Sequence, residues 1–222
     1  TAELRDRNLM LRSMIGDEGQ SRAGAMHFNN SGIPPSAAKG ASIFSPVAAE
    51  VLIRYYGGDQ PLKILDPFAG GGTRAAVAAT FGHNYTGIEL RKEEADRVNR
   101  MIFRSRFSGS ANVLCGDSTD LGGASVWKAR EKGPFNFLIT CPPYWRLEQY
   151  GGGDADLSEA ADYASYREGI QRTLIWTREV LAPDALAVWV VGNYLEDDEY
   201  VDIQADLSCS ARALGWALHD TA

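Results

Sequence analysis

The sequence predicts an α/β protein with a mostly parallel, doubly wound sheet of the Rossmann-like type. Three observations support this prediction. Short apolar runs alternate with longer segments of helical periodicity, a pattern typical of parallel sheets covered on both faces. A glycine run at 70–72 joins the first apolar run to a segment rich in helix formers. The 222 residues, 45% of them hydrophobic, are enough for one such domain with a sizeable core.

Residues 1–40 and 41–222 form two predicted parts. In the first we expect a short helix over 2–15 and then a loop or mobile arm with Gly, Ser, Asn and a Pro-Pro pair. The second is the main domain. Its predicted helices span 46–56, 74–80, 91–107, 162–180 and 202–214, and its predicted strands span 62–65, 84–88, 111–114, 135–139 and 186–191. In the helix over 91–107 we expect Val98, Ile102 and Phe103 to face the core.

The unit over 62–89 has the features of a nucleotide-binding sheet. Glycine lets the backbone approach a ligand where a Cβ would clash, although tight turns use glycine as well. Glu89 ends the second strand about 20 positions beyond the glycines, where its carboxylate can accept hydrogen bonds from two ribose hydroxyls. Asp66 ends the first strand and no lysine follows the glycines, which argues against a phosphate-binding loop. A carboxylate there fits a ligand with a cationic amine and no phosphate, and S-adenosylmethionine answers that description.

A second motif follows the strand over 135–139. Pro142 and Pro143 cannot continue a central strand, because proline donates no ladder hydrogen bond. The chain therefore leaves the sheet in a stiff direction and carries Tyr144 and Trp145 to the carboxyl edge, where open α/β sheets bind ligands. Such a corner suits a planar heterocycle with an exocyclic amine. Taken alone, it is equally compatible with a surface turn whose aromatic side chains cover the core.

The segments DPFAGGGT (66–73), GIEL (87–90) and CPPYW (141–145) resemble, in this order, the DNA amino-methyltransferases that modify cytosine N4 or adenine N6. The resemblance is to the branch with an SPPYW motif and covers roughly residues 41–220. It implies a class I methyltransferase domain over 41–222, S-adenosylmethionine as the cofactor, and DNA with a flipped target base as the partner. The family's sheet ordinarily ends with a closing pair of strands, of which residues 216–219 supply at most the start.

The resemblance also implies roles for individual residues. Asp66 would hold the methionine ammonium, Glu89 the ribose and Asp117 the adenine amine, although Asp117 also suits a turn or a helix N-cap. The Pro142 carbonyl and the Cys141 side chain would accept hydrogen bonds from the two N–H groups of the target amine. The expected catalytic residues are Cys141, Pro142, Pro143 and Tyr144, with Tyr144 stacking on the base. The expected cofactor-binding residues are Phe44, Ser45, Asp66, Pro67, Phe68, Ala69, Gly70, Gly72, Thr73, Glu89, Asp117 and Ser118. Trp145 and Arg146 would contact nucleic acid, and no metal is expected.

Cys141 departs from the family pattern, which usually has Ser, Asp or Asn at this position. A thiol is a weaker hydrogen-bond acceptor than these side chains. Three explanations remain open: a tolerated substitution with slower chemistry, a loss of activity, or a nucleophile as in cytosine-C5 methyltransferases. The last is the least favoured, because that family's cysteine follows its proline, whereas Cys141 precedes Pro142.

Two other functions fit the sequence. An RNA guanine-N2 methyltransferase uses a similar glycine loop and an Asp/Asn-Pro-Pro-Tyr corner, and Trp145 is the feature that favours DNA over it. A cofactor-binding or nucleic-acid-binding module without full catalytic activity is the other alternative, and Cys141 is the feature that favours it.

The net charge of −7 argues at first sight against nucleic-acid binding, which depends on phosphate neutralisation. The charge is uneven, however: residues 1–150 have 15 acids and 18 bases, whereas residues 151–222 have 14 acids and 4 bases. Bases gather at Arg97, Arg100, Arg104 and Arg106, and at Lys128, Arg130 and Lys132. Solvated helix faces explain most of them, and Arg146 is the better candidate for a phosphate contact. DNA binding requires positive surface around the cleft.

Cysteine usage and hydropathy indicate the compartment. Cys115, Cys141 and Cys209 are widely spaced and odd in number, which matches neither a disulfide framework nor a zinc site. The sequence has no apolar run near 18 residues and no signal-peptide pattern at its start. We therefore expect a cytoplasmic protein that does not associate with membranes.

Overall fold

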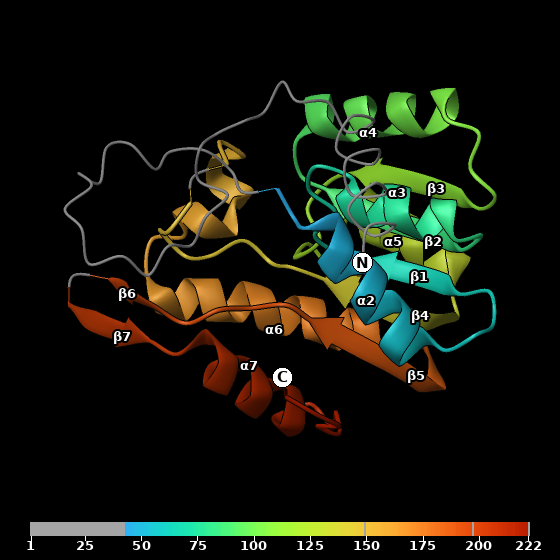
Figure 1. Cartoon of the computed structure of the whole chain (residues 1–222). Coiled ribbons are helices and arrows are strands. Elements are labelled where there is room, and N and C mark those ends of the chain that lie inside the picture. Colours follow the sequence, from blue (N-terminus) through green and yellow to red (C-terminus); the bar gives the residue numbers. More distant parts are fainter. Residues whose placement is uncertain (1–42, 149, 197, 222) are drawn as a thin grey trace.

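The computed structural model of the protein describes residues 43–148, 150–196 and 198–221. The helix and arm predicted within residues 1–40 lie outside these ranges. The described part contains a five-stranded sheet with helices on both faces and a two-stranded hairpin that is not hydrogen-bonded to it (Figure 1). None of the described helices is long and apolar enough to cross a membrane.

The sheet is entirely parallel. It consists of β1 (Lys63–Asp66), β2 (Asn84–Glu89), β3 (Ser110–Cys115), β4 (Phe135–Thr140) and β5 (Leu181–Trp189), in the order β3-β2-β1-β4-β5. The carboxyl ends of parallel strands meet at one edge. The order reverses between β1 and β4, and ligands bind in open α/β sheets beside such a switch point.

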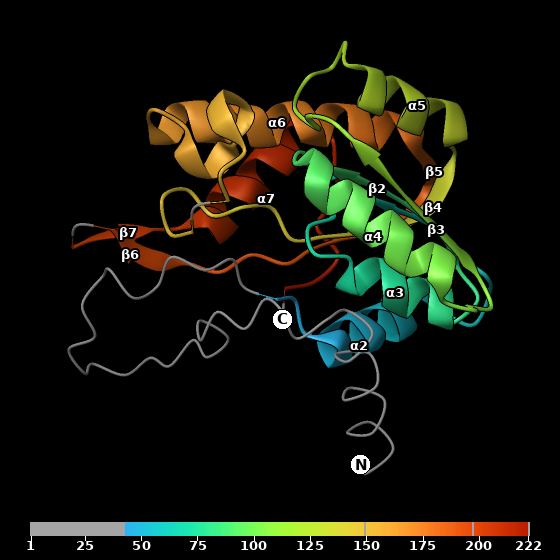
Figure 2. The ribbon, with the colours of Figure 1, turned by 90° about the horizontal axis from the view of Figure 1, so that it is seen from above.

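Helices cover both faces of this sheet (Figure 2). On one face lie α2 (Pro46–Gly57), α3 (Thr73–Thr80) and α4 (Lys92–Arg104), which bury Ile53, Val77 and Val98. On the other lie α5 (Ala124–Lys132) and α6 (Tyr163–Val180), where Val126 and Trp176 are buried. This arrangement is the predicted doubly wound, Rossmann-like fold.

The remaining elements gather beyond the carboxyl ends of β4 and β5. They are two short 3₁₀ helices, η3 (Gly153–Ala155) and η4 (Leu157–Glu159), the antiparallel hairpin of β6 (Tyr194–Glu196) and β7 (Glu199–Val201), and α7 (Ile203–Ala213). A third apolar cluster, which includes Tyr144, Tyr166 and Ile203, joins these elements to α6.

The five predicted strands and the five predicted helices of the main domain are all present. The largest difference in bounds is at β5, which begins at Leu181 instead of residue 186. Leu181 pairs with Phe135, and the register shifts before Leu186 pairs with Phe137. Pro183 lies in this shifted stretch. It is tolerated there because β5 is the last strand of the described sheet, and an edge strand does not need every ladder donor.

Phe103 does not face the core as predicted, since its side chain is 91% exposed. The apolar residues of α4 that pack on the core are Ala95, Val98, Met101 and Ile102, which recur at spacings of three and four. Phe103 lies about 100° around the helix from Ile102 and therefore points to solvent.

The helix α5, the β6–β7 hairpin and the two 3₁₀ helices were not predicted. The helix α5 has few apolar positions, of which Val126 and Ala129 are fully buried, so its periodicity is weak. The strands of the β6–β7 hairpin have three residues each and lie in an acid-rich segment. Conversely, residues 216–219 form no strand, and Trp216 packs on the third apolar cluster. Within the described residues, the sheet ends at β5 without a closing pair of strands.

Candidate functional site

The carboxyl edge of the sheet opens into a cavity of about 690 Å³, a size typical of small-molecule sites. Loops that follow β1, β2, β3 and β4 all contribute to its wall, as the parallel topology requires. Of the predicted site residues, those that line it are Phe44, Pro67, Phe68, Ala69, Gly70, Thr73, Glu89, Asp117, Ser118, Cys141, Pro143 and Tyr144.

The glycine loop is fixed against β2 and α4. The backbone N–H of Gly70 donates to Glu89 Oε2 at 3.1 Å, and Arg97 Nη2 donates to the carbonyl of Gly71 at 2.8 Å. Gly72, which precedes α3, has a φ of 82°, and a Cβ there would lie 2.7 Å from Val98 Cγ1. Only glycine satisfies both conditions, so the loop passes closely over α4 while its backbone faces the cavity.

Asp66 does not line the cavity, and its side chain is fully buried. Its carboxylate accepts hydrogen bonds from Arg74 Nε at 2.6 Å, Thr140 Oγ1 at 2.6 Å and Tyr85 Oη at 2.7 Å. The backbone N–H of Phe68 is a fourth donor, at 3.1 Å. In this geometry the protein itself supplies four donors to the oxygens of Asp66.

Arg74 lines the cavity instead, and the sequence prediction did not include it. Burial alone would lower the pKa of Arg74, but Asp66 beside it raises that pKa above its ordinary value, so the guanidinium keeps its charge. Nη2 donates to the carbonyl of Phe68 at 2.5 Å, and the guanidinium carbon lies 4.7 Å from the centre of the Phe44 ring. Arg74 directly follows the glycine-threonine run in the sequence, and this position could have identified it as a residue of the site.

Two further carboxylates do face the cavity. Glu89 accepts from the N–H groups of Gly70 and Arg91, and its burial raises its pKa above that of an ordinary glutamate. Asp117 accepts from the N–H of Thr119 at 2.7 Å and from its hydroxyl at 3.0 Å. The turn role considered for Asp117 is therefore formed, and the residue lines the cavity as well.

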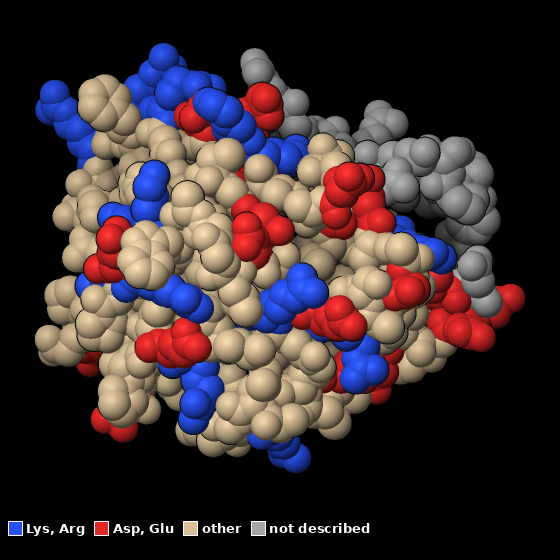
Figure 3. Space-filling view, turned by 180° about the vertical axis from the view of Figure 1, so that it is seen from behind, with Lys and Arg blue, Asp and Glu red and all other residues tan. Residues whose placement is uncertain are grey.

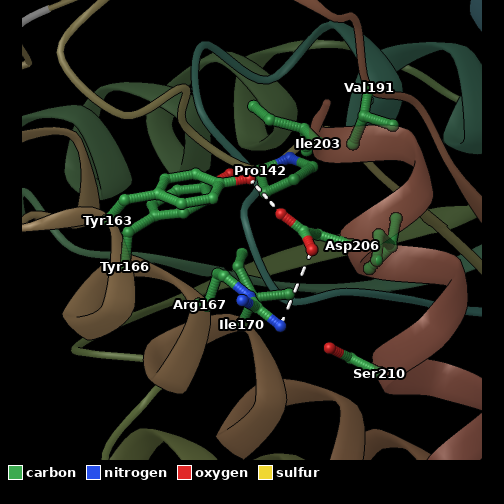
Figure 4. Close-up of a pocket in the computed structure, with 10 residues that line it drawn as sticks. Pro142, Tyr163, Tyr166, Arg167, Ile170, Val191, Ile203, Asp206 and Ser210 are labelled. Atoms are coloured by element: carbon green, nitrogen blue, oxygen red, sulfur yellow. Dashed lines mark hydrogen bonds and ion pairs between the residues drawn. The ribbon is translucent and has the colours of Figure 1, made fainter. Parts of the chain in front are cut away.

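The residues of the corner after β4 line two different pockets. Cys141, Pro143 and Tyr144 line the large cavity, whereas Pro142 lines a small pocket between α6 and α7. Figure 4 shows Pro142 in this pocket beside Tyr163, which donates to Asp206 at 2.8 Å.

Cys141 is mostly buried within the cavity wall. Burial raises the pKa of its thiol, and the nearby charge of Arg74 lowers it by less. The thiol is therefore protonated at neutral pH, which disfavours a thiolate nucleophile.

Trp145 and Arg146 lie outside the cavity lining. Trp145 Nε1 donates to the carbonyl of Ala160 at 3.0 Å, and the Arg146 guanidinium lies over the Trp145 ring at 4.4 Å. The N–H of Arg146 donates to the carbonyl of Ser158, and its φ of 60° is unusual for a non-glycine residue. Both residues thus anchor the segment that follows the corner, and Arg146 remains exposed.

Two predicted cofactor residues have structural positions instead of places in the lining. Ser45 caps α2 by accepting from the N–H of Ala48 at 3.4 Å, and Gly72 precedes α3. Conversely, the sequence prediction missed several lining residues besides Arg74: Gly71, Arg91, Arg97, Tyr150 and Leu157. Arg91 is the N-cap of α4 and Arg97 lies in its first two turns, at positions that a strand-to-helix junction beside Glu89 would have suggested.

Comparison with solved structures places the fold among those of class I methyltransferases. A methyltransferase from Pyrococcus furiosus matches with a TM-score of 0.54 and 17% identity, over 98% of this chain and 90% of that one. The PH0226 protein from Pyrococcus horikoshii OT3 matches with a TM-score of 0.50 and 12% identity, over 73% of this chain and 76% of that one. TrmN from Thermus thermophilus matches with a TM-score of 0.48 and 22% identity over 68% of this chain, which spans only 38% of that protein. No protein-family model and no curated protein matches the sequence.

Proposed function

We propose that the chain is an S-adenosylmethionine-dependent methyltransferase that methylates an exocyclic amine of a DNA base, with cytosine N4 favoured over adenine N6. One observation carries the proposal. A single cavity has the glycine loop and Glu89 in one wall and Cys141, Pro143 and Tyr144 in another. A methyl donor against the first wall would face a planar base against the second. The class I methyltransferase fold supports the same reaction, and the resemblance of CPPYW to SPPYW favours cytosine.

The residues of the first wall fit S-adenosylmethionine. Each carboxylate oxygen of Glu89 accepts one backbone hydrogen bond, and an ionised oxygen has capacity for another, which suits two ribose hydroxyls. Asp117 has similar capacity for the adenine amine, and Phe68 supplies an apolar surface between them. When bound, the cofactor supplies an electrophilic methyl group on its sulfonium.

Arg74 takes the role of binding the charged amino-acid end of the cofactor. Its Nη1 has no hydrogen-bond partner among the described residues, and the side chain lines the cavity beside Phe44. A guanidinium in that position binds a carboxylate well. Asp66 is then a positioning residue that holds Arg74 through Nε and does not contact the ligand. This assignment replaces the expected contact between Asp66 and the ammonium.

The residues of the second wall act on the target amine. The amine nitrogen is a poor nucleophile because its lone pair is delocalised into the ring, so acceptors for its protons favour the reactive geometry. The neutral thiol of Cys141 would be one acceptor and the backbone carbonyl of Pro142 the other. Tyr144 would stack on the base, a contact worth about 1–3 kcal/mol. Trp145 and Arg146 would contact the nucleic acid beside the flipped base, whose extrusion costs a few kcal/mol.

Nucleoside mass spectrometry tests this proposal. DNA and RNA would be isolated from a host without amino-methylated DNA bases of its own, after expression of the chain or of its Tyr144→Ala variant. We expect N4-methylcytosine in DNA with the first and little with the second. Detection of N6-methyladenine in DNA would support a DNA amino-methyltransferase that acts on adenine instead of cytosine. N2-methylguanine in RNA would support the guanine methyltransferase, and an unmodified pool with retained binding of S-adenosylhomocysteine would support a binding module.

A further inference from the structure

The carboxyl-terminal half of α4 and the loop after it form a positively charged surface on an acidic protein. Residues 97–116 contain four arginines and no acidic residue, although the net charge of the chain is −7. Arg100, Arg104 and Arg106 are exposed there. Figure 3 shows Lys and Arg side chains gathered over α4, at the upper left of that view.

These arginines are not neutralised by neighbouring acids. Asp96, one turn before Arg100 on the helix, forms its ion pair with Lys92. The side chains of Arg104 and Arg106 form no ion pair or hydrogen bond with the part of the chain that the structure describes. Phe103 lies among them with 91% of its surface exposed, an unusual state for a large apolar side chain.

We propose that Arg100, Phe103, Arg104 and Arg106, the α4 basic face, bind the sugar-phosphate backbone of the DNA substrate. This rests on the proposed function. Three exposed arginines that form no ion pair within the described residues complement a polyanion, and Phe103 supplies an apolar contact to the sugars between phosphates. The opposite charge dominates elsewhere: the β6–β7 hairpin and its surroundings contain Glu196, Asp198, Glu199 and Asp202, which would repel the same partner.

The position of α4 connects this face to the cavity. Glu94 and Arg97, in the first half of the helix, line the cavity, and Arg104 ends the helix. A helix of 13 residues is about 20 Å long, which corresponds to roughly six base-pair steps along one DNA strand. A duplex whose target base enters the cavity would therefore reach the α4 basic face within one helical turn.

The helix α5, on the opposite face of the sheet, offers a matched contrast. It also has an exposed aromatic residue, Trp127, and exposed lysines, Lys128 and Lys132. There, however, Trp127 donates to Glu131 at 3.1 Å, and Arg130 pairs with Glu179 at 3.0 Å. On α5 the acid Glu131 stands beside three bases, and Arg130 is paired with Glu179 of α6, so fewer of its charges remain for a polyanion.

The test is the salt dependence of binding to a short fluorescein-labelled DNA duplex, followed by fluorescence anisotropy over a series of KCl concentrations. The double variant Arg104→Gln/Arg106→Gln is compared with Lys128→Gln/Lys132→Gln, which removes the same charge from α5. We expect the first to lower the slope of log K against log salt by about 2, since each phosphate contact contributes about 0.9. The second should leave the slope unchanged.

Phe103→Ser gives a second measurement, with Tyr55→Ser on α2, where Tyr55 is 76% exposed, as the control. We expect Phe103→Ser to weaken binding about fivefold or more and Tyr55→Ser to have no effect. Equal slopes for the two double variants would overturn the proposed surface, as would a wild-type protein that does not bind the duplex.

Methyl transfer to the same duplex separates this inference from the proposed function. If the wild type methylates the duplex and the α4 variant matches the α5 variant in binding, only the surface is wrong. If the wild type binds through the α4 basic face but transfers no methyl group, the surface stands and the proposed function is wrong.

Discussion

The two walls of the cavity are built from different interactions. The wall at the ends of β1 and β2 is held by hydrogen bonds between buried polar side chains, with Asp66 accepting from Arg74, Tyr85 and Thr140. The wall after β4, together with the aromatic cluster behind it, forms an aromatic wall that is held mainly by packing. Tyr144 meets Tyr194 edge-on at 6.2 Å, Trp145 meets Tyr163 at 5.3 Å, and Tyr163 stacks on Tyr166 at 5.7 Å.

This difference has a physical consequence. Hydrogen bonds in a low-dielectric interior are directional, so a fully satisfied polar network specifies one geometry and fails when one partner is lost. Apolar contact is non-directional, and its loss is graded. The polar wall therefore suits a cofactor of constant shape, whereas the aromatic wall suits a substrate that must enter and leave. Four predictions test this contrast.

Removing the charge at the centre of the polar wall should have the largest effect. We expect Asp66→Asn to lower the free energy of unfolding by about 3–5 kcal/mol, because it leaves the buried cation of Arg74 without its partner. Urea unfolding measures this. Asp59→Asn, at an exposed position, should change stability by less than about 0.5 kcal/mol. Equal stabilities for the two variants would mean that the network does not hold this wall.

Glu89→Gln should weaken binding of S-adenosylhomocysteine by about 1.5–3 kcal/mol, measured by titration calorimetry, because hydrogen bonds to the charged carboxylate are lost. Burial raises the pKa of Glu89, so the ionised form is lost at a higher pH than for an ordinary glutamate. Wild-type affinity should therefore fall as the pH is lowered through this raised pKa, and the Gln variant should lack that dependence. Glu93→Gln, on the exposed side of α4, serves as the control. An unchanged pH profile in the Gln variant would exclude Glu89 as the titrating group.

Cys141→Ser should keep the methyl-transfer rate or raise it by up to about fivefold. A hydroxyl is a better acceptor than a thiol, and one neutral hydrogen bond contributes about 1 kcal/mol. Single-turnover kinetics with the DNA substrate would measure the rate, with Cys209→Ser, at an exposed site on α7, as the control. Complete loss of activity in Cys141→Ser alone would favour covalent catalysis instead.

The smallest effect is expected for Tyr166→Phe in the aromatic wall. The Tyr166 hydroxyl is buried and has no hydrogen-bond partner among the described residues, so its removal should change stability by less than about 0.5 kcal/mol or increase it. Tyr85→Phe is the matched change in the polar wall, where the hydroxyl donates to Asp66 at 2.7 Å. It should cost about 1.5–3 kcal/mol. Similar values for the two variants in thermal unfolding would remove the contrast between the walls.

Sequence patterns predicted those features that depend on local order along the chain. Gly70 and Glu89 reach the cavity because a strand, a turn and the next parallel strand bring them to one edge, whatever the rest of the protein does. The orientation of Asp66 depends on Tyr85 in β2 and Thr140 in β4, which are distant in sequence, and no local pattern indicates that both hydroxyls point at it. The orientation of Trp145 could not be predicted either, because its hydrogen-bond partner Ala160 belongs to a segment without periodicity. The prediction that Phe103 faces the core was wrong for a different reason, since the helical period alone places Phe103 on the solvent side of α4.

The three adjacent glycines of the loop are under different structural constraints. Gly72 has a left-handed backbone and Val98 against it, so reducing the size of residue 98 would remove the clash and leave the backbone strain. Gly70 has the left-handed backbone with open space around it, and Gly71 has neither constraint. Homologues should therefore drift freely at position 71, accept Asn or Asp at 70, and keep glycine at 72. The glycine that varies least among related sequences would therefore be the one that the fold requires.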